Sequence, residues 1–217
     1  MALQPLWLEA EAIASAAHRL RTAGALMVLP YTDLEQARRS VDMAVQRAGL
    51  LPAEGLLVAV HDAKRRGFVS VVNAVYAHSH STWLGYMAQD AFAGRGWLQL
   101  ALAALAQGQG GLLAFNDGKW GGALAAFGLA RRDWVAQVYG DSFFFPGYRS
   151  HFADVELTLI AQAQDRLVYE PQSVLVEVDW NKERSAVSPD DRRLFRARVR
   201  QGLGGRVLDQ QLLAMFA

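Results

Sequence analysis

The chain has 217 residues, of which 52% are hydrophobic and 20% charged, and its formal net charge is +1. This length and composition support a globular core with a tail and exclude a disordered protein. The lack of cysteine excludes disulfides and thiolate metal sites, and the near-zero net charge excludes a global attraction to nucleic acid or membranes. No apolar run reaches the roughly 20 residues that span a bilayer. Residues 1–21 carry acids before arginines, unlike a signal peptide, so we expect a mature cytoplasmic protein.

The first elements alternate between predicted helices and strands. Residues 4–22 place apolar side chains at helical spacing, so we expect an N-terminal helix, within residues 1–24, packed on the domain. The apolar run over residues 25–29, stopped by Pro30, is typical of a central parallel strand. Asp33 is then expected to cap the next helix.

That helix is expected to end at Gly49. A second buried strand over residues 56–60 follows and leads to Asp62. The next predicted helix covers residues 68–77 and contains Asn73.

The stretch over residues 82–97, TWLGYMAQDAFAGRGW, is the most informative part of the sequence for locating a site. Its apolar run predicts a third strand, which ends in Gln89 and Asp90 before two glycines. A helix over residues 97–106 and a fourth strand over residues 112–115 complete the pattern.

Strand and helix therefore recur in units of roughly 25–30 residues, which predicts an α/β fold with a mostly parallel, Rossmann-like sheet flanked by helices. Ligands bind at the carboxyl edge of such sheets. Acids follow strand after strand at that edge: Asp33, Asp62, Asp90 and Asp117. Because Asp is also common at helix N-caps and turns, a structural role for each of them is the alternative.

The second half is less regular. We expect a strand over residues 134–138, then an aromatic loop over residues 142–148 that belongs either to a cleft wall or to the core. A helix begins near Ser150 with acidic side chains in its first turns, where they also favour the helix dipole. Residues 166–169 and 174–178 have the pattern of short strands that close the sheet.

The composition changes after Trp180. Residues 181–217 are rich in arginine, and Ser188-Pro189 marks a helix start. We therefore divide the chain into a domain over residues 1–180 and a basic helical C-terminal appendage over residues 181–217. Its charges form either a solvated face or a binding surface for a phosphate-bearing acceptor such as nucleic acid.

The order of these motifs, over roughly residues 26–179, resembles inverting glycosyltransferases of the family-2 type, which have the GT-A fold. LGYMAQDAFAGRGWL, residues 84–98, resembles the metal motif of that family. YGDSFFFPGYRSHFADVEL, residues 139–157, is similar to its acceptor loop and catalytic helix. YEPQSVLVEVDW, residues 169–180, is similar to its late strand.

The resemblance implies roles for single residues. Asp90, with Asp179 as a further oxygen ligand, would hold Mn²⁺ or Mg²⁺ against the diphosphate of a UDP- or GDP-sugar. Asp154 would be the general base for the acceptor hydroxyl. The residues expected to bind the nucleotide sugar are Pro30, Tyr31, Asp62, Arg66, Asn73, Gln89 and Asp90. The residues expected to bind or orient the acceptor are Trp120, His151 and Glu156, with a plain helix-start role as the alternative for His151.

The sequence also departs from the family pattern. Gln89 stands in place of a second acid, and Ala153 stands in place of the Glu of the catalytic pair. These departures favour an alternative, a non-catalytic nucleotide-sugar-binding domain. A nucleotidyltransferase or a Rossmann dehydrogenase would show a glycine-rich loop after the first strand, and residues 31–34 contain no glycine. The acceptor stays open among sugars, lipids, proteins and modified DNA bases, and we name a glycan or a modified nucleic acid base as candidates.

Overall fold

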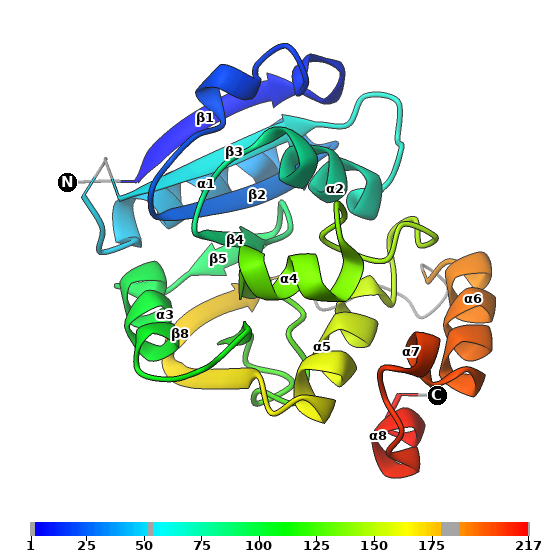
Figure 1. Cartoon of the computed structure of the whole chain (residues 1–217). Coiled ribbons are helices and arrows are strands. Elements are labelled where there is room, and N and C mark those ends of the chain that lie inside the picture. Colours follow the sequence, from blue (N-terminus) through cyan, green and yellow to red (C-terminus); the bar gives the residue numbers. More distant parts are fainter. Residues whose placement is uncertain (1–2, 52–53, 179–186, 217) are drawn as a thin grey trace.

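The computed structural model describes residues 3–51, 54–178 and 187–216. In this part of the chain, one sheet of eight strands runs through the molecule in the order β1-β3-β2-β4-β7-β6-β8-β5 (Figure 1). The strands are β1 (Gln4–Glu9), β2 (Ala25–Tyr31), β3 (Gly55–His61), β4 (Trp83–Tyr86), β5 (Ala91–Ala93), β6 (Leu112–Asn116), β7 (Gly128–Arg131) and β8 (Leu167–Glu177). The helices are α1 (Leu34–Arg47), α2 (Phe68–His78), α3 (Trp97–Ala106), α4 (Arg132–Tyr139), α5 (Ala153–Ala163), α6 (Pro189–Arg200), α7 (Gly202–Gly205) and α8 (Gln210–Ala214).

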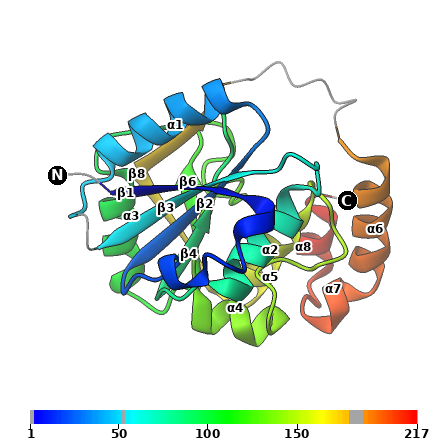
Figure 2. The ribbon, with the colours of Figure 1, turned by 90° about the horizontal axis from the view of Figure 1, so that it is seen from above.

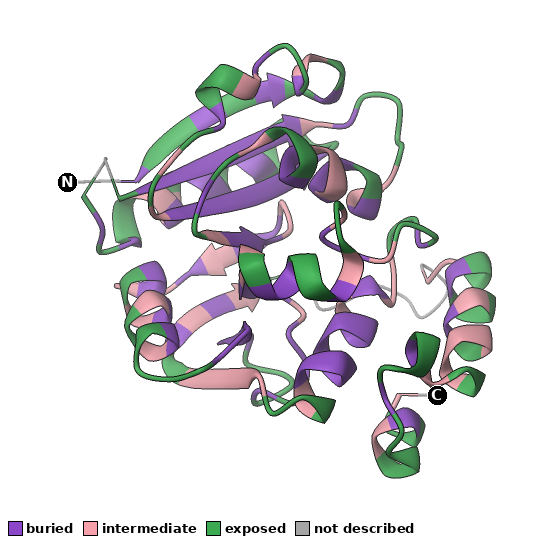
Figure 3. Ribbon diagram, in the orientation of Figure 1, coloured by how far each residue is buried: buried purple, intermediate pink, exposed green. Residues whose placement is uncertain are grey.

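Helices cover both faces of the sheet (Figure 2). The apolar residues of α1 and α3 form one core with one face, and those of α2, α4 and α5 form a second core with the other. Every residue of β2 is buried, as Figure 3 shows for the central strands. Burial on both faces explains why the sequence of β2 is a continuous apolar run rather than an alternating one.

The strands β1, β3, β2 and β4 are mutually parallel, so their carboxyl ends lie at the same edge. β7 then runs antiparallel between β4 and β6, while β6 pairs in parallel with β8. The predicted α/β class with a largely parallel sheet is confirmed. The antiparallel strand β7 lies in the second half of the chain, where strand and helix patterns do not alternate regularly in the sequence.

The predicted N-terminal helix is wrong. Residues 4–9 form the edge strand β1, which pairs in parallel with β3, and only short 3₁₀ turns, Ala10–Ala12 and Ala17–Arg19, follow. In β1, Leu6 and Leu8 are buried between exposed neighbours, which is the period-two pattern of a strand with one covered face. Farther along the segment, Ala10, Ile13, Ala16 and Leu20 are all buried. Their spacing in the sequence is that of a helix, but the backbone forms only short turns.

Two predictions in the second half also need correction. Residues 134–138 belong to helix α4, in which Trp134, Val135 and Val138 face the core at helical spacing. The two strands expected after Arg166 are one strand, β8, whose register against β6 shifts at Phe115/Asn116. The predicted helix near Ser150 is confirmed as α5.

The C-terminal helices α6 to α8 pack beside α5 (Figure 1). Phe195 of α6 stacks on Phe152 with ring centroids 4.9 Å apart, and Leu203 and Val207 are buried in the same core as α5. The predicted helical character of this segment is confirmed for α6 and α8, whereas Leu203 and Gly204 within α7 have left-handed backbone angles and residues 206–209 are not helical. No helix among the described residues is long and apolar enough to cross a membrane.

Candidate functional site

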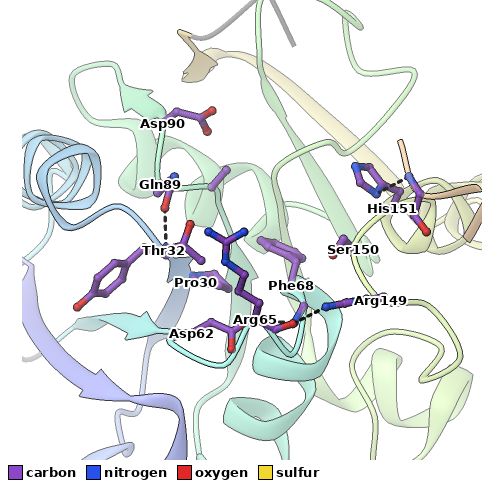
Figure 4. Close-up of a pocket in the computed structure, with 14 residues that line it drawn as sticks. Pro30, Thr32, Asp62, Arg65, Phe68, Gln89, Asp90, Arg149, Ser150 and His151 are labelled. Atoms are coloured by element: carbon purple, nitrogen blue, oxygen red, sulfur yellow. Dashed lines mark hydrogen bonds between the residues drawn. The ribbon is translucent and has the colours of Figure 1, made fainter. Parts of the chain in front are cut away.

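A cavity of about 500 Å³ opens at the carboxyl edge of β2, β3 and β4 (Figure 4). The end of β2 supplies Pro30 and Tyr31, and the segment after β4 supplies Gln89 and Asp90. The remaining wall comes from the loop after β3 and from residues 149–151, with Ser188 at its border. Its position at the edge where the parallel strands end is the place where α/β sheets bind ligands.

The loop after β3 is shaped by Asp62, which is 5% exposed. One carboxylate oxygen accepts the Arg66 N–H and the other accepts the Gly67 N–H, both at 2.9 Å. This loop presents Arg65 to the cavity, and Figure 4 shows its side chain reaching into the space near Gln89. Asp62 thus shapes the wall through its carboxylate.

Arg66 requires a correction. Its guanidinium lies outside the cavity and donates to Glu11 at 2.7 Å, so the expected contact with a nucleotide sugar is not supported by its position. Arg65 occupies that place instead. The loop after β3 turns tightly, with the Arg65 N–H donating to the Asp62 carbonyl and a positive φ at Arg65, so a run of three basic residues does not reveal which one faces inward.

Gln89 ties the end of β4 to the start of α1. Its side-chain oxygen accepts the N–H groups of Thr32 and Asp33 at 2.8 and 3.0 Å, and its amide donates to Gln36 at 3.0 Å. An amide both accepts and donates, which a carboxylate at this position would not do. Gln89 therefore fixes the backbone on which Asp90, 8% exposed, enters the cavity wall.

A second compartment of about 460 Å³ adjoins the first. The two compartments share Phe68, Ala88, Ser150 and His151 as lining residues, so they lie side by side, and together they are named the cleft. The second compartment is also lined by Asp154 from α5, Glu177 from the end of β8, and the aromatic residues Trp120, Phe127, Phe144 and Phe152.

Asp154 has an unusual environment in this compartment. Burial raises its pKa to about 6; backbone N–H groups at the start of α5 oppose this shift, and the carboxylate of Glu177 adds to it. A carboxyl group with a pKa near neutrality exchanges protons readily under physiological conditions.

Asn73 lies outside both compartments, which corrects its expected role. Its side-chain oxygen accepts the N–H groups of Phe143 and Phe144 at 3.1 and 2.8 Å, and its amide donates to the Phe144 carbonyl at 3.1 Å. Asn73 therefore holds the aromatic loop. Phe143 and Phe144 are fully buried, and Phe144 still forms part of the wall of the second compartment.

Glu156 is also corrected. It is completely buried and receives hydrogen bonds from the hydroxyls of Tyr139 and Tyr148, each at 2.8 Å. Arg198 of α6 donates to both of its oxygens at 2.6 Å. Burial, together with the Glu156 charge, raises the pKa of both tyrosines well above the usual value, so both hydroxyls remain protonated. Glu156 joins α5 to α6 and does not face an acceptor.

The residue that sequence reasoning missed is Asp191 on the first turn of α6. Its carboxylate accepts the backbone N–H groups of Arg149, Ser150 and His151, each at 2.9 Å. The signal in the sequence is the helix start Ser188-Pro189-Asp190-Asp191, which places a carboxylate in the first turn of a helix. The sequence does not indicate which segment this carboxylate contacts.

Comparison with models of known protein families gives no match, and no curated protein sequence matches the chain. Solved structures do match it. Mannosyltransferase PcManGT from Pyrobaculum calidifontis, solved with GDP-Man and Mn²⁺, aligns over 83% of this chain and 61% of its own, with 16% identity and a TM-score of 0.57. S. aureus TarS 1-349 aligns over 89% of this chain and 70% of its own, with 12% identity and a TM-score of 0.64.

A third structure is glucosyl-3-phosphoglycerate synthase from Mycobacterium tuberculosis, solved with Mg²⁺ and UDP. It aligns over 93% of this chain and 85% of its own, with 12% identity and a TM-score of 0.55. The chain has the GT-A fold. It spans about three fifths of the length of the mannosyltransferase.

On this GT-A framework, the described residues offer a limited set of metal ligands. No three His, Asp or Glu side chains among them lie close enough together to form a metal site by themselves. Asp90 fits an ion that takes its other ligands from phosphate oxygens and water, as Mg²⁺ often does. Asp179, the second ligand expected from the sequence, lies outside the described residues.

Proposed function

We propose that this chain transfers a sugar from a nucleotide diphosphate sugar to an acceptor hydroxyl. The observation that carries the proposal is the pair of adjoining compartments, in which Asp90 lines one and Asp154 the other, while His151 lines both. Two carboxylates in adjoining spaces meet the two needs of the reaction, which are a stabilised leaving diphosphate and a deprotonated acceptor. The GT-A fold, shared with enzymes solved with GDP-Man or UDP, supports this choice.

The first compartment is proposed to bind the donor. Asp90 would hold Mn²⁺ or Mg²⁺, with Asp179 as a further ligand, and the ion would neutralise the charge of the departing diphosphate. Arg65 adds a guanidinium that suits phosphate oxygens. Pro30, Tyr31 and the wall shaped by Asp62 would enclose the nucleoside.

The second compartment is proposed to bind the acceptor. The hydroxyl oxygen of the acceptor forms a bond to the anomeric carbon of the donor sugar, while the bond from that carbon to the diphosphate oxygen breaks. The proton of the acceptor hydroxyl passes to the Asp154 carboxylate. A single displacement of this kind inverts the anomeric centre. Trp120 offers an aromatic face against which a sugar or base ring can stack, and His151 orients the acceptor at the junction.

The proposed acceptor is a glycan or a modified nucleic acid base. The outer face of α6 favours an acceptor that carries phosphate, because Arg192, Arg196 and Arg200 are exposed at intervals of four residues and so share one side of the helix. Arg193 instead pairs with Asp190. Binding of a polyanion along this row would weaken steeply with salt.

The test is a thermal-shift panel of UDP, GDP and their sugars, with and without Mn²⁺. A donor that binds the folded chain raises its melting temperature, and turnover of that donor is then measured with the wild type and with Asp154→Asn. No shift with any nucleotide would refute the donor site. Binding without turnover would establish the alternative, a non-catalytic nucleotide-sugar-binding domain, which the presence of Gln89 and Ala153 favours.

A further inference from the structure

The first turn of α6 contacts the cleft through a buried carboxylate. Asp191 is 3% exposed, and it accepts the three consecutive N–H groups of residues 149–151. A buried charge is costly unless hydrogen bonds compensate it, and three N–H donors provide that compensation here. This geometry fixes the backbone of residues 149–151 more firmly than packing alone.

Neighbouring contacts hold Asp191 itself in place. The Ser188 hydroxyl accepts the Asp191 N–H at 3.2 Å, and the Ser188 N–H points to Nδ1 of His151 at 3.4 Å. Farther along α6, Arg198 pairs with the buried Glu156. The helix is therefore joined to α5 at one end and to the cleft at the other.

Residues 149–151 in turn connect both compartments. Ser150 and His151 line both, whereas Arg149 lines the first. The Arg149 guanidinium donates to the Arg65 carbonyl at 2.7 Å (Figure 4). The backbone carbonyl of Arg149 accepts the Val69 N–H at 3.0 Å. A shift of this segment would therefore change the donor loop and the acceptor wall together.

We infer that Asp191 is a positioning residue for the transfer reaction, which holds residues 149–151 and His151 at the junction of the donor and acceptor compartments. The inference rests on the proposed function. It makes α6 a structural part of the site instead of a separate appendage. Small misplacements of groups around reacting atoms have large effects on rate, so the loss of this carboxylate is expected to act mainly on kcat.

The test compares Asp191→Asn with Asp190→Asn, a matched control on the same helix turn whose side chain is exposed and pairs with Arg193. For Asp191→Asn we expect hydrogen exchange of the amides of residues 149–151 to rise about tenfold. We also expect kcat to fall about tenfold or more while the Kd for the nucleotide diphosphate changes by less than about threefold. Asp190→Asn should leave all three quantities unchanged.

Wild-type exchange at residues 149–151 together with wild-type kcat in Asp191→Asn would overturn the inference. If Asp191→Asn does not fold, Asp191→Glu is measured instead, because it keeps the charge and lengthens the side chain by one methylene. Its kcat is expected to lie between that of the wild type and a full loss. An unchanged kcat in Asp191→Glu with unchanged exchange would overturn it equally. A chain that binds no nucleotide would contradict the proposed function. The hydrogen-exchange measurement would still test the contact between Asp191 and residues 149–151, because exchange needs no turnover.

Discussion

Asp154 and Glu156 lie two residues apart on the first turn of α5, yet their carboxylates occupy opposite environments. Asp154 lines the second compartment of the cleft, whereas Glu156 is completely buried against Arg198. Side chains two residues apart on a helix do not share a face, so one turn supplies both groups. In the proposed reaction the Asp154 carboxylate accepts the proton, whereas the Glu156 carboxylate holds α6 through Arg198.

Asp154→Asn is expected to lower kcat by about 10²- to 10⁴-fold, because an amide cannot accept the acceptor proton. In the wild type, the base must be ionised, and its pKa is about 6, so kcat/KM should fall below that pH and level off above it. A pH–rate profile between about pH 4.5 and about pH 8 measures both. A profile whose acidic limb persists in Asp154→Asn would assign the base to another residue.

The same substitution is expected to stabilise the fold at neutral pH. The Asp154 pKa is about 6 in the folded chain and 3.8 as the ordinary value, so between these values the folded chain binds more protons than the unfolded chain. The free energy of unfolding therefore falls as pH rises through this window, and the loss is complete above it. Asp154→Asn should melt higher than the wild type at about pH 7.5, with a smaller difference near about pH 4. Equal melting temperatures of Asp154→Asn and the wild type at neutral pH would contradict a raised pKa of the buried Asp154 carboxyl group.

Glu156→Gln is expected to lower the free energy of unfolding by about 3 kcal/mol, because it leaves the Arg198 charge buried without its carboxylate. Chemical denaturation measures the change. Glu35→Gln is the matched control, since it breaks an exposed pair with Arg39 that contributes about 0.5 kcal/mol or less. A loss in Glu156→Gln no larger than in Glu35→Gln would show that α6 is held by its apolar contacts alone.

The sequence predicted the parallel part of the fold well, because β2 and residues 56–60 of β3 are continuous apolar runs and α1 and α3 have clear boundaries. The Asp33 carboxylate does accept the N–H groups of Glu35 and Gln36 as a helix cap. The failures have a physical cause. β1 is covered on one face only, and α4 is short, so neither carries enough periodic residues to separate a helix from a strand.

The sequence predicts which residues line the cavity where they come at or just after the end of a strand, as for Tyr31 and Asp90. Asn73 and Glu156 line neither compartment, and the sequence does not predict this, because a polar residue that holds a loop and one that binds a ligand have the same appearance in sequence. Asp191 was missed because its partners lie about 40 residues earlier, and only tertiary structure brings them together.

Gly67→Ala is expected to disturb the cleft and to lower stability by about 1–3 kcal/mol. Gly67 has φ of 107°, a region that L side chains rarely adopt, and an added Cβ would lie 2.5 Å from the Arg149 carbonyl oxygen. Gly108→Ala is the control, because nothing lies within 4 Å of its added Cβ. Thermal melts and nucleotide titrations compare the two. Unchanged donor binding in Gly67→Ala would argue that the loop after β3 does not form the donor wall.

Asp90→Asn is expected to abolish the part of nucleotide-diphosphate binding that depends on Mn²⁺. The amide is neutral and a weaker ligand for a hard cation, so the ion would lose one of its two proposed carboxylate ligands while the nucleoside contacts remain. Thermal shifts with UDP or GDP should therefore become equal with and without Mn²⁺ in this variant, whereas the wild type should shift further with the ion. Asp42→Asn, an exposed position on α1, is the control and should keep the wild-type response. A full Mn²⁺ response in Asp90→Asn would move the metal site elsewhere in the cleft.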